Sequence, residues 1–171
     1  RRIPAGRIAE HLKRVAKAEE VEITEDALAI IARRSNGGMR DALVMLEQAI
    51  SHGGSPITED AVLDMLGLVD RDTHAAFLTA IEQNDQQKVI ETIDSLVERG
   101  RDLEVFLADA IETIRDRLIE KGSATKRDIA IARGLLEVKA ELFRSLDRRI
   151  RLEIGVLDLM ARLNEEPSSL P

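Results

Sequence analysis

Apolar residues recur along the whole chain at the three- and four-residue spacing of amphipathic helices. Near the start, Ile8, Leu12 and Val15 follow one another in steps of four and three residues, which places them on one helix face. Every convincing periodic segment has this spacing. The pattern predicts nine helices, at about 5–20, 25–34, 39–50, 59–66, 72–84, 86–99, 103–121, 126–146 and 148–164.

Two of these helices begin with the same five residues, Ile-Thr-Glu-Asp-Ala. Thr24 and Thr58 stand where a side-chain oxygen can accept a hydrogen bond from the first helical turn. The acidic pair that follows each threonine favours the positive end of the helix dipole. Nothing around the two copies recurs at a fixed period. The shared phrase therefore predicts two capped helix starts rather than a repeat architecture.

The segment GLVDRD, which starts at Gly67, is the strongest candidate for a domain boundary. We expect an all-α protein in which a small helical bundle at residues 1–68 precedes a five-helix bundle at 69–166, with a flexible tail at 167–171. The chain opens on RRIPAGRI without an initiator methionine. We therefore also expect a larger protein upstream.

The last two predicted helices are apolar over a wider arc than the others. Such an arc indicates burial on more than one side, either within the bundle or against neighbouring subunits. Gly134 and Gly155 lie inside these helices, where glycine costs stability, so each is predicted to mark a close approach of two helices. The residues of the arc are Ile129, Leu135, Leu136, Leu142, Phe143, Ile150, Ile154, Leu157, Met160 and Leu163.

Composition agrees with an all-α protein. Aromatic residues make up only 2% of the 171 residues, and helical bundles can be filled by aliphatic side chains alone. The residues before Gly67 carry nine Lys and Arg against eleven Asp and Glu, and the rest carry sixteen against twenty-one. Neither part has the basic excess that binding to a nucleic-acid backbone requires.

Several kinds of site are excluded by residues that the chain lacks. It has no cysteine, so it forms neither disulfides nor thiolate metal sites, and we expect a cytoplasmic protein. No apolar run approaches the roughly 20 residues of a membrane-spanning helix. His11, His52 and His74 are far apart, so no metal site is expected. Because no P-loop, Gly-x-Ser-x-Gly elbow or cysteine nucleophile is present, no catalytic residue is expected either.

Two basic features could suggest DNA binding, but each has a simpler interpretation. Arg148, Arg149 and Arg151 are interleaved with Asp147 and Glu153, which favours a salt-bridged helix face or a subunit contact. The second and third predicted helices could form a helix-turn-helix motif. The third helix, however, offers one arginine and no lysine, which argues against reading of DNA by that helix.

The segment between the second and third helices combines two glycines with a following arginine, in the sequence NGGMRDA. A helix start offers unpaired backbone N–H groups and a partial positive charge, and Arg40 adds a forked donor suited to phosphate. Gly37 and Gly38 would let a ligand approach the backbone. Alternatively, Arg40 pairs with Asp41 or Glu47 at the surface. Spacing alone favours this second interpretation, because helix-glycine-helix turns are common.

The first seventy residues closely resemble the lid domain of the bacterial DNA polymerase III gamma/tau family, the ATPase subunits of the sliding-clamp loader. The segment GGMRDALVMLEQAI looks like that family's sensor 2 segment, and VLDMLGLVD resembles the end of its lid. The remaining hundred residues resemble the family's collar domain in helix count, lengths and order. The resemblance therefore implies a small AAA+ lid bundle followed by a five-helix collar bundle for oligomerisation.

The resemblance implies a function that depends on a domain upstream of this chain. That AAA+ domain would bind ATP with Mg²⁺, Arg40 would contact the ATP phosphates as the sensor 2 arginine, and Met39 would lie near the nucleotide. The collar would assemble gamma/tau copies with delta and delta-prime subunits into a ring. In DNA replication, this ring would place the beta sliding clamp on primed DNA, and no membrane is implied.

Two other functions stay open at this point. The chain could be the lid and helical assembly module of another AAA+ ATPase, such as a Holliday-junction helicase or a replication initiator. Those families usually carry a DNA-binding domain after the lid, and the acidic second half of this chain argues against one. The chain could also be a helical scaffold that binds no nucleotide. A P-loop and a Ser-Arg-Cys-like arginine-finger segment upstream of Arg1 would favour the clamp loader, and their absence would leave the scaffold.

Overall fold

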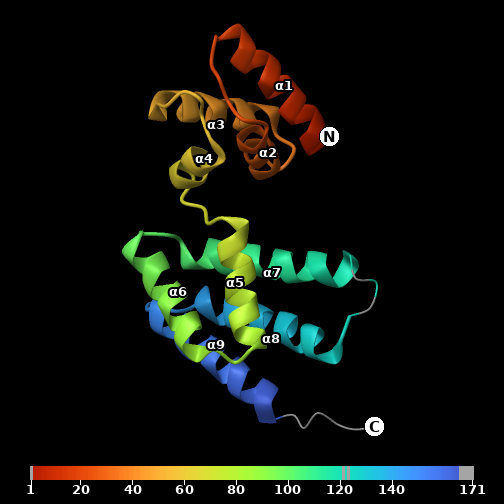
Figure 1. Cartoon of the computed structure of the whole chain (residues 1–171), viewed down its shortest axis with the longest axis vertical. Coiled ribbons are helices and arrows are strands. Elements are labelled where there is room, and N and C mark those ends of the chain that lie inside the picture. The colour runs from red at the N-terminus through yellow and green to blue at the C-terminus, as the bar shows by residue number, and fades with distance from the viewer. Residues whose placement is uncertain (1, 121, 123, 166–171) are drawn as a thin grey trace. The chain divides into compact units, whose positions relative to one another are not determined.

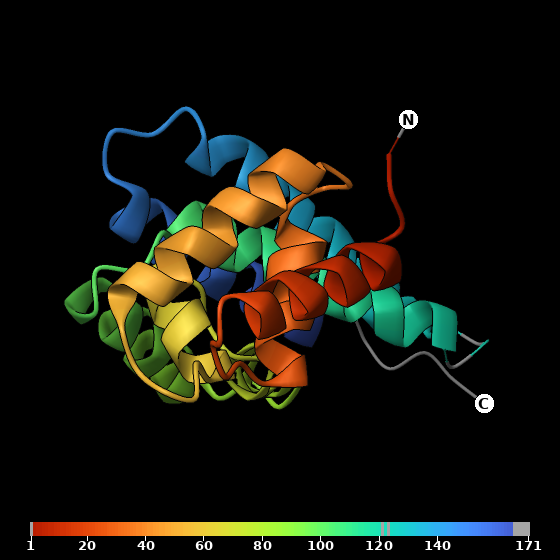
Figure 2. The ribbon, with the colours of Figure 1, turned by 90° about the horizontal axis from the view of Figure 1, so that it is seen from above.

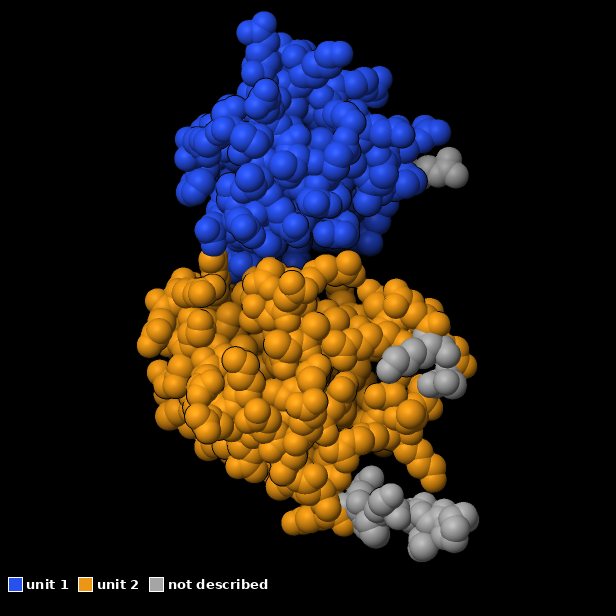
Figure 3. All heavy atoms as spheres, viewed as in Figure 1, with its two compact units in different colours: residues 1–68 blue, residues 69–171 orange. Residues whose placement is uncertain are grey.

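A computed structural model describes residues 2–120, 122 and 124–165 of the chain. Every regular element in this described part is a helix, so the prediction of an all-α protein is confirmed. The chain divides into two compact units, which we call unit 1 (residues 1–68) and unit 2 (residues 69–171) (Figures 1 and 3). The tail predicted at 167–171 lies outside the described residues.

Unit 1 is a small helical bundle in which α2 and α3 each contact all the other helices. α2 packs against α1, α3 and α4, and Figure 2 shows the red α1 beside the orange α2 and α3. The core contains the periodic apolar residues, and Ile8 and Leu12 are fully buried. The helices in the described part of unit 1 are α1 (Ala5–Ala18), α2 (Glu25–Arg34), α3 (Met39–His52) and α4 (Glu59–Met65).

The two copies of Ile-Thr-Glu-Asp-Ala lie side by side in unit 1. Ile57 donates its backbone N–H to the carbonyl oxygen of Glu22 at 2.8 Å, and Thr24 donates its N–H to the carbonyl oxygen of Ile57 at 3.0 Å. These bonds form a parallel bridge between Ile23 and Ile57. The hydroxyls of Thr24 and Thr58 accept hydrogen bonds from the first turns of α2 and α4, each at 3.3 Å. Both predicted caps are confirmed, and the bridge holds the two helix starts side by side.

In its described part, unit 2 is a five-helix bundle around one apolar core, as predicted. Phe106 is buried in this core, where its ring stacks on His74 at 4.7 Å and meets Phe77 edge-on at 5.1 Å. The guanidinium of Arg127 donates to the carbonyl oxygens of Glu82 and Leu163, at 3.0 and 3.3 Å, and so joins the ends of α5 and α9. The helices are α5 (Arg71–Glu82), α6 (Gln86–Glu98), α7 (Leu103–Glu120), α8 (Lys126–Leu142) and α9 (Arg148–Glu165).

Two helices of unit 2 are predicted to end at Lys121 and at Leu146. The end predicted at Lys121 lies outside the described residues. The end predicted at Leu146 is wrong, because α8 stops at Leu142. Asp147 accepts a hydrogen bond from the backbone N–H of Ile150 at 3.0 Å and so caps the start of α9. The residues between Leu142 and this cap must reverse the chain, and they cannot continue α8.

Two glycines allow α8 and α9 to approach closely, as predicted. A Cβ atom on Gly134 would lie 2.3 Å from the Cδ1 atom of Leu159. A Cβ atom on Gly155 would lie 2.9 Å from a γ-carbon of Val138. Both distances are shorter than the roughly 3.5–4.0 Å of a favourable carbon–carbon contact. Each glycine therefore receives a side chain of the facing helix directly against its backbone.

Asp70 caps α5, the first helix of unit 2. Its carboxylate accepts a hydrogen bond from the backbone N–H of Thr73 at 2.8 Å and another from the Thr73 hydroxyl at 2.7 Å. Burial raises the pKa of the Asp70 carboxyl, but the hydrogen bonds from Thr73, a further backbone hydrogen bond and the attraction of His74 together outweigh this effect. The pKa of Asp70 in the folded protein therefore lies below its ordinary value.

We predict that Asp70→Ala lowers the free energy of unfolding of unit 2 by about 1 kcal/mol near neutral pH, because it removes a helix cap. Since folding lowers the pKa of Asp70, the charge-dependent part of this stabilisation is present above the unfolded pKa of about 3.9 and is lost as the pH falls through the folded value. Urea unfolding of both proteins at neutral and acidic pH measures the difference. Asp70→Asn, which keeps an acceptor without the charge, is the control. A difference between wild type and alanine variant that grows on acidification would contradict this account.

Candidate functional site

Arg40 lies on the first turn of α3, two residues after the helix cap Gly38. Its side chain is exposed, whereas Met39 beside it is half-buried. Among the described residues, no side chain caps this helix start, and no ion pair joins Arg40 to Asp41 or Glu47. The alternative that Arg40 is an ordinary surface charge with a local acidic partner therefore finds no support in the structure.

The turn from α2 to α3 is held by short hydrogen bonds. Ser35 is buried, and its hydroxyl donates to the carbonyl oxygen of Ala32 at 2.8 Å. Gly38 donates its backbone N–H to the carbonyl oxygen of Ser35, also at 2.8 Å. Gly37 has a φ angle of +83°, a left-handed conformation that glycine adopts without a steric penalty. Arg40 therefore follows a turn of defined geometry.

The space beside the two glycines is filled by the chain itself. A Cβ atom on Gly37 would lie 2.8 Å from the Cβ atom of Arg2 and 3.0 Å from the backbone nitrogen of Ile3. A Cβ atom on Gly38 would lie 2.8 Å from a carboxylate oxygen of Asp41. On the side where a Cβ atom would stand, residues of this chain occupy the space, so the expectation that these glycines let a ligand approach the backbone stays a prediction for the other sides of the turn. The close approach is a contact within unit 1.

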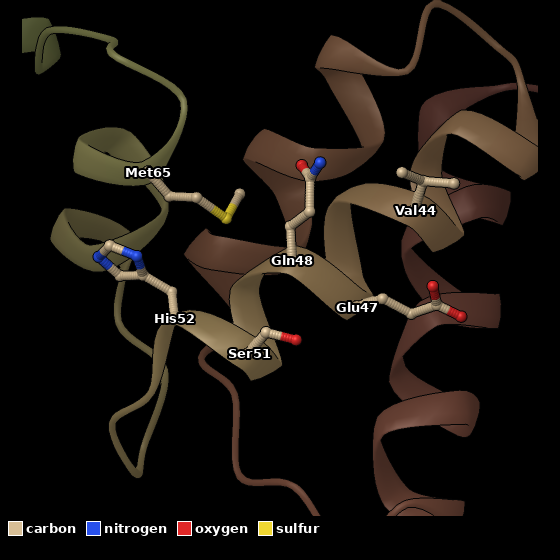
Figure 4. A pocket seen from close by; sticks show the side chains of 6 residues that line it. All are labelled: Val44, Glu47, Gln48, Ser51, His52 and Met65. Atoms are coloured by element: carbon tan, nitrogen blue, oxygen red, sulfur yellow. The ribbon is translucent and has the colours of Figure 1, made fainter.

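A pocket of about 580 Å³ lies between α3 and α4. Figure 4 shows the Met65 side chain extending from α4 toward α3, while the other lining side chains come from α3. Neither Met39 nor Arg40 lines this pocket. Its lining mixes apolar, amide, hydroxyl, carboxylate and imidazole groups, and this mixture identifies no class of ligand. The lining residues are Val44, Glu47, Gln48, Ser51, His52 and Met65.

The three histidines lie in different places. His52 lines the pocket, His74 stacks in the core of unit 2, and His11 lies on α1. Among residues 2–120, 122 and 124–165, no three His, Cys, Asp or Glu side chains form a group that could hold a metal ion. None of the described helices combines the length and the apolar character needed to cross a membrane.

The arginines at the start of α9 form ion pairs with other helices and with their own helix. This arrangement confirms the prediction of a salt-bridged helix face. Since acidic partners lie beside these arginines, they do not form a basic track for DNA. The pairs are Arg148–Glu104 at 3.7 Å, Arg149–Asp94, Arg149–Glu153 at 2.9 Å and Arg151–Glu141 at 3.5 Å.

Six large apolar residues of α8, α9 and the turn between them are exposed, and we call them the apolar face of unit 2. The side chain of Phe143 is 73% exposed, and Leu146 is fully exposed. The wide apolar arc predicted for these helices is therefore buried inside the unit on one side only. The second side of the arc is predicted to be buried either within the bundle or against a neighbouring subunit. Burial within the bundle is wrong, because the side chains on this side are exposed. The apolar face consists of Ile129, Leu136, Phe143, Leu146, Ile150 and Ile154.

Comparisons with protein families match two adjacent segments of the chain. Residues 7–55 match the DNA polymerase III clamp loader subunit, ATPase lid domain, and Arg40 lies inside this match. Residues 57–132 match the DNA polymerase III subunits gamma and tau domain III. The second match includes α4, which packs within unit 1. The predicted border between a lid at 1–68 and a collar at 69–166 therefore stays a prediction.

Curated relatives carry the same subunit names. The tau subunit of DNA polymerase III from Bacillus subtilis is 29% identical over 170 residues, which are 97% of this chain and 29% of that protein. The tau subunit from Escherichia coli is 29% identical over 104 residues, which are 61% of this chain and 16% of that protein. Human replication factor C subunit 4 is 23% identical over 152 residues, 88% of this chain and 41% of that protein. The chain thus spans less than half the length of each relative.

Both family matches are to DNA polymerase III subunits, so they do not favour the alternatives of another AAA+ ATPase or of a scaffold without a nucleotide. The matches follow each other in the order lid and then domain III. The Bacillus tau subunit matches nearly the whole chain in the same way. Because the helical fold and the two adjacent matches support the same assignment, the chain belongs to the DNA polymerase III gamma/tau clamp-loader family.

Proposed function

We propose that this chain is the nucleotide-sensing lid and the assembly domain of a clamp-loader ATPase subunit. In this proposal, a AAA+ domain elsewhere in the full-length protein binds ATP with Mg²⁺, and Arg40 contacts the nucleotide phosphates. Unit 2 is the collar that joins gamma/tau copies with delta and delta-prime subunits. The assembled ring acts in the cytoplasm, where it places the beta sliding clamp on primed DNA during replication.

The observation that carries this proposal is the unneutralised charge of Arg40 within the segment that matches a clamp-loader lid. The guanidinium is exposed and stands on a helix start without a side-chain cap among the described residues. Backbone N–H groups at a helix start and an adjacent arginine together suit an anion with several oxygen atoms, such as a phosphate group. This arrangement supports a contact with a nucleotide that another domain holds. Met39, which is half-buried next to Arg40, is proposed to lie beside the same nucleotide.

The apolar face of unit 2 supports the assembly part of the proposal. Large apolar side chains that are exposed on neighbouring helices are typical of surfaces that bind another protein. The arginines at the start of α9 are already neutralised within unit 2, so a partner need not supply charges to them. We propose that the apolar face packs against unit 2 of a second gamma/tau copy.

We predict that the double variant Phe143→Asp with Leu146→Asp weakens self-association of the full-length protein about tenfold or more. A charge buried at an apolar contact costs more than the roughly 1.4 kcal/mol that corresponds to a factor of ten. Sedimentation equilibrium over a range of protein concentrations measures the effect. Both side chains are exposed in unit 2, so the fold is expected to stay intact.

The matched control for this experiment is Ile119→Asp. Ile119 is also a large exposed apolar residue, at 63%, but it lies on α7 outside the apolar face. Its replacement is expected to leave self-association unchanged. If the double variant assembles as well as the Ile119 variant, the apolar face does not form the contact between copies.

A further inference from the structure

The chain that enters unit 1 is attached to the turn that carries Arg40. Ile3 donates its backbone N–H to the carbonyl oxygen of Gly37 at 3.1 Å. The backbone of Arg2 lies equally close, since a Cβ atom on Gly37 would be 3.1 Å from the Cα atom of Arg2. Glycine at position 37 therefore meets two requirements. It adopts the positive φ angle of the turn, and it leaves room for the entering chain.

This attachment continues from Gly37 to the start of α3. Gly38 donates its N–H to the carbonyl oxygen of Ser35 at 2.8 Å and accepts a hydrogen bond from the N–H of Ala42 at 3.1 Å. On the other side of the contact, the carbonyl oxygen of Pro4 accepts a hydrogen bond from Ile8 at 3.2 Å, so the entering chain leads directly into α1. A movement of residues 2–4 relative to α3 would have to break these contacts.

We propose that Gly37 is a positioning residue for Arg40, because it locks the entering segment Arg2–Pro4 and the start of α3 into one rigid body. A displacement of the chain upstream of Arg2 is then transmitted to Arg40, because the entering segment and the start of α3 move together and do not bend relative to each other. This inference rests on the proposed function of Arg40 as a phosphate contact. Gly37 itself touches no nucleotide and acts through the arginine three residues later.

The test is a double-mutant cycle in the full-length protein, with the dissociation constant of ATP as the measured quantity. Gly37→Ala places a methyl group where Arg2 now lies, and it is expected to weaken ATP binding about tenfold, in the range of couplings between neighbouring residues. In a protein that already carries Arg40→Ala, the same substitution is expected to cause no further loss. A residue that only stabilises the fold would weaken binding equally in both backgrounds.

Gly67→Ala is the matched control for the strain of a left-handed alanine. Gly67 has a φ angle of +66°, and a Cβ atom added there would meet no described atom within 4 Å. It thus shares the conformational cost of Gly37→Ala but not the collision with the entering chain. Gly67→Ala is expected to lower the melting temperature of unit 1 by the backbone strain alone, and to leave ATP affinity unchanged.

A second pair of variants breaks the hydrogen bond while leaving Gly37 in place. Ile3→Pro removes the N–H that bonds to Gly37, whereas Ile3→Ala shortens the side chain and keeps that donor. Only Ile3→Pro is expected to reproduce the loss of ATP affinity. Equal effects of these two variants, or additive effects of Gly37→Ala and Arg40→Ala, would overturn the positioning role. If Arg40→Ala alone leaves ATP affinity unchanged, the proposed function of Arg40 fails instead, so the two failures are distinguishable.

Discussion

Replacement of Arg40 by alanine is expected to weaken ATP binding by the full-length protein about 10- to 100-fold and to reduce ATP-dependent clamp loading with it. A hydrogen bond between a guanidinium and a phosphate contributes roughly 1.5–3 kcal/mol, and each 1.4 kcal/mol is a factor of ten in affinity. The Arg40 side chain is exposed, and within the described residues it has no ion pair. Its removal should therefore leave the stability of unit 1 unchanged.

Two further variants make the Arg40 experiment specific. Arg40→Lys keeps the charge but loses the forked donor, so an intermediate loss is expected. Arg14→Ala removes another exposed arginine of unit 1, in the middle of α1, and should leave nucleotide binding and clamp loading intact. Titration with a fluorescent ATP analogue measures affinity, and thermal unfolding checks the fold. Normal clamp loading by the Arg40→Ala protein would refute the assignment of this residue.

If Arg40 contacts the nucleotide from a mobile lid, its effect must appear as a difference between two states. An arginine shifts an equilibrium between open and closed forms only by binding the nucleotide better in one of them. The Arg40→Ala protein should therefore also lose the effect of ATP on the position of the lid. In this proposal, the exposed, unneutralised side chain in unit 1 couples nucleotide binding to a movement of the lid in the full-length protein.

Features that depend on neighbouring residues in the sequence could be predicted from it. Thr24 and Thr58 cap their helices because a cap needs only a side-chain oxygen and the next three residues. Gly134 could be recognised as a close-packing position because glycine inside an apolar helix is costly unless a neighbour uses the space. In each case the signal lies within one helical turn, although the partner of Gly134, Leu159, lies on another helix.

Features that depend on distant residues could not be predicted in the same way. The pattern at Gly37 indicates space for a ligand, because nothing near this turn in the sequence shows that Arg2 and Ile3 fill it. The wide apolar arc of the last two helices is recognisable, but periodicity alone does not reveal whether its second side faces the core or solvent. These outcomes depend on tertiary contacts, which local sequence patterns do not reveal.

Replacement of Gly134 by alanine is expected to lower the free energy of unfolding of unit 2 by about 1–2 kcal/mol. Overpacking of a buried contact typically costs about 1–3 kcal/mol, and the better helix propensity of alanine returns up to about 1 kcal/mol. The collision makes the net change in stability unfavourable, because the added methyl carbon would lie 2.3 Å from Leu159. Leu159 is itself buried, so its side chain has no free space into which to move.

Gly6→Ala tests this account in the opposite direction. Gly6 lies in α1, and a Cβ atom there would meet no described atom within 4 Å, so only the gain in helix propensity remains, up to about 1 kcal/mol. Urea unfolding of the two variants, followed separately for each unit by hydrogen exchange, measures the expected loss of stability in unit 2 and the expected gain in unit 1. If Gly134→Ala also stabilises its unit, α8 and α9 are not held at the distance that the glycines permit. Because the apolar face is carried by these two helices, a loss of their spacing would also disturb the surface proposed for assembly.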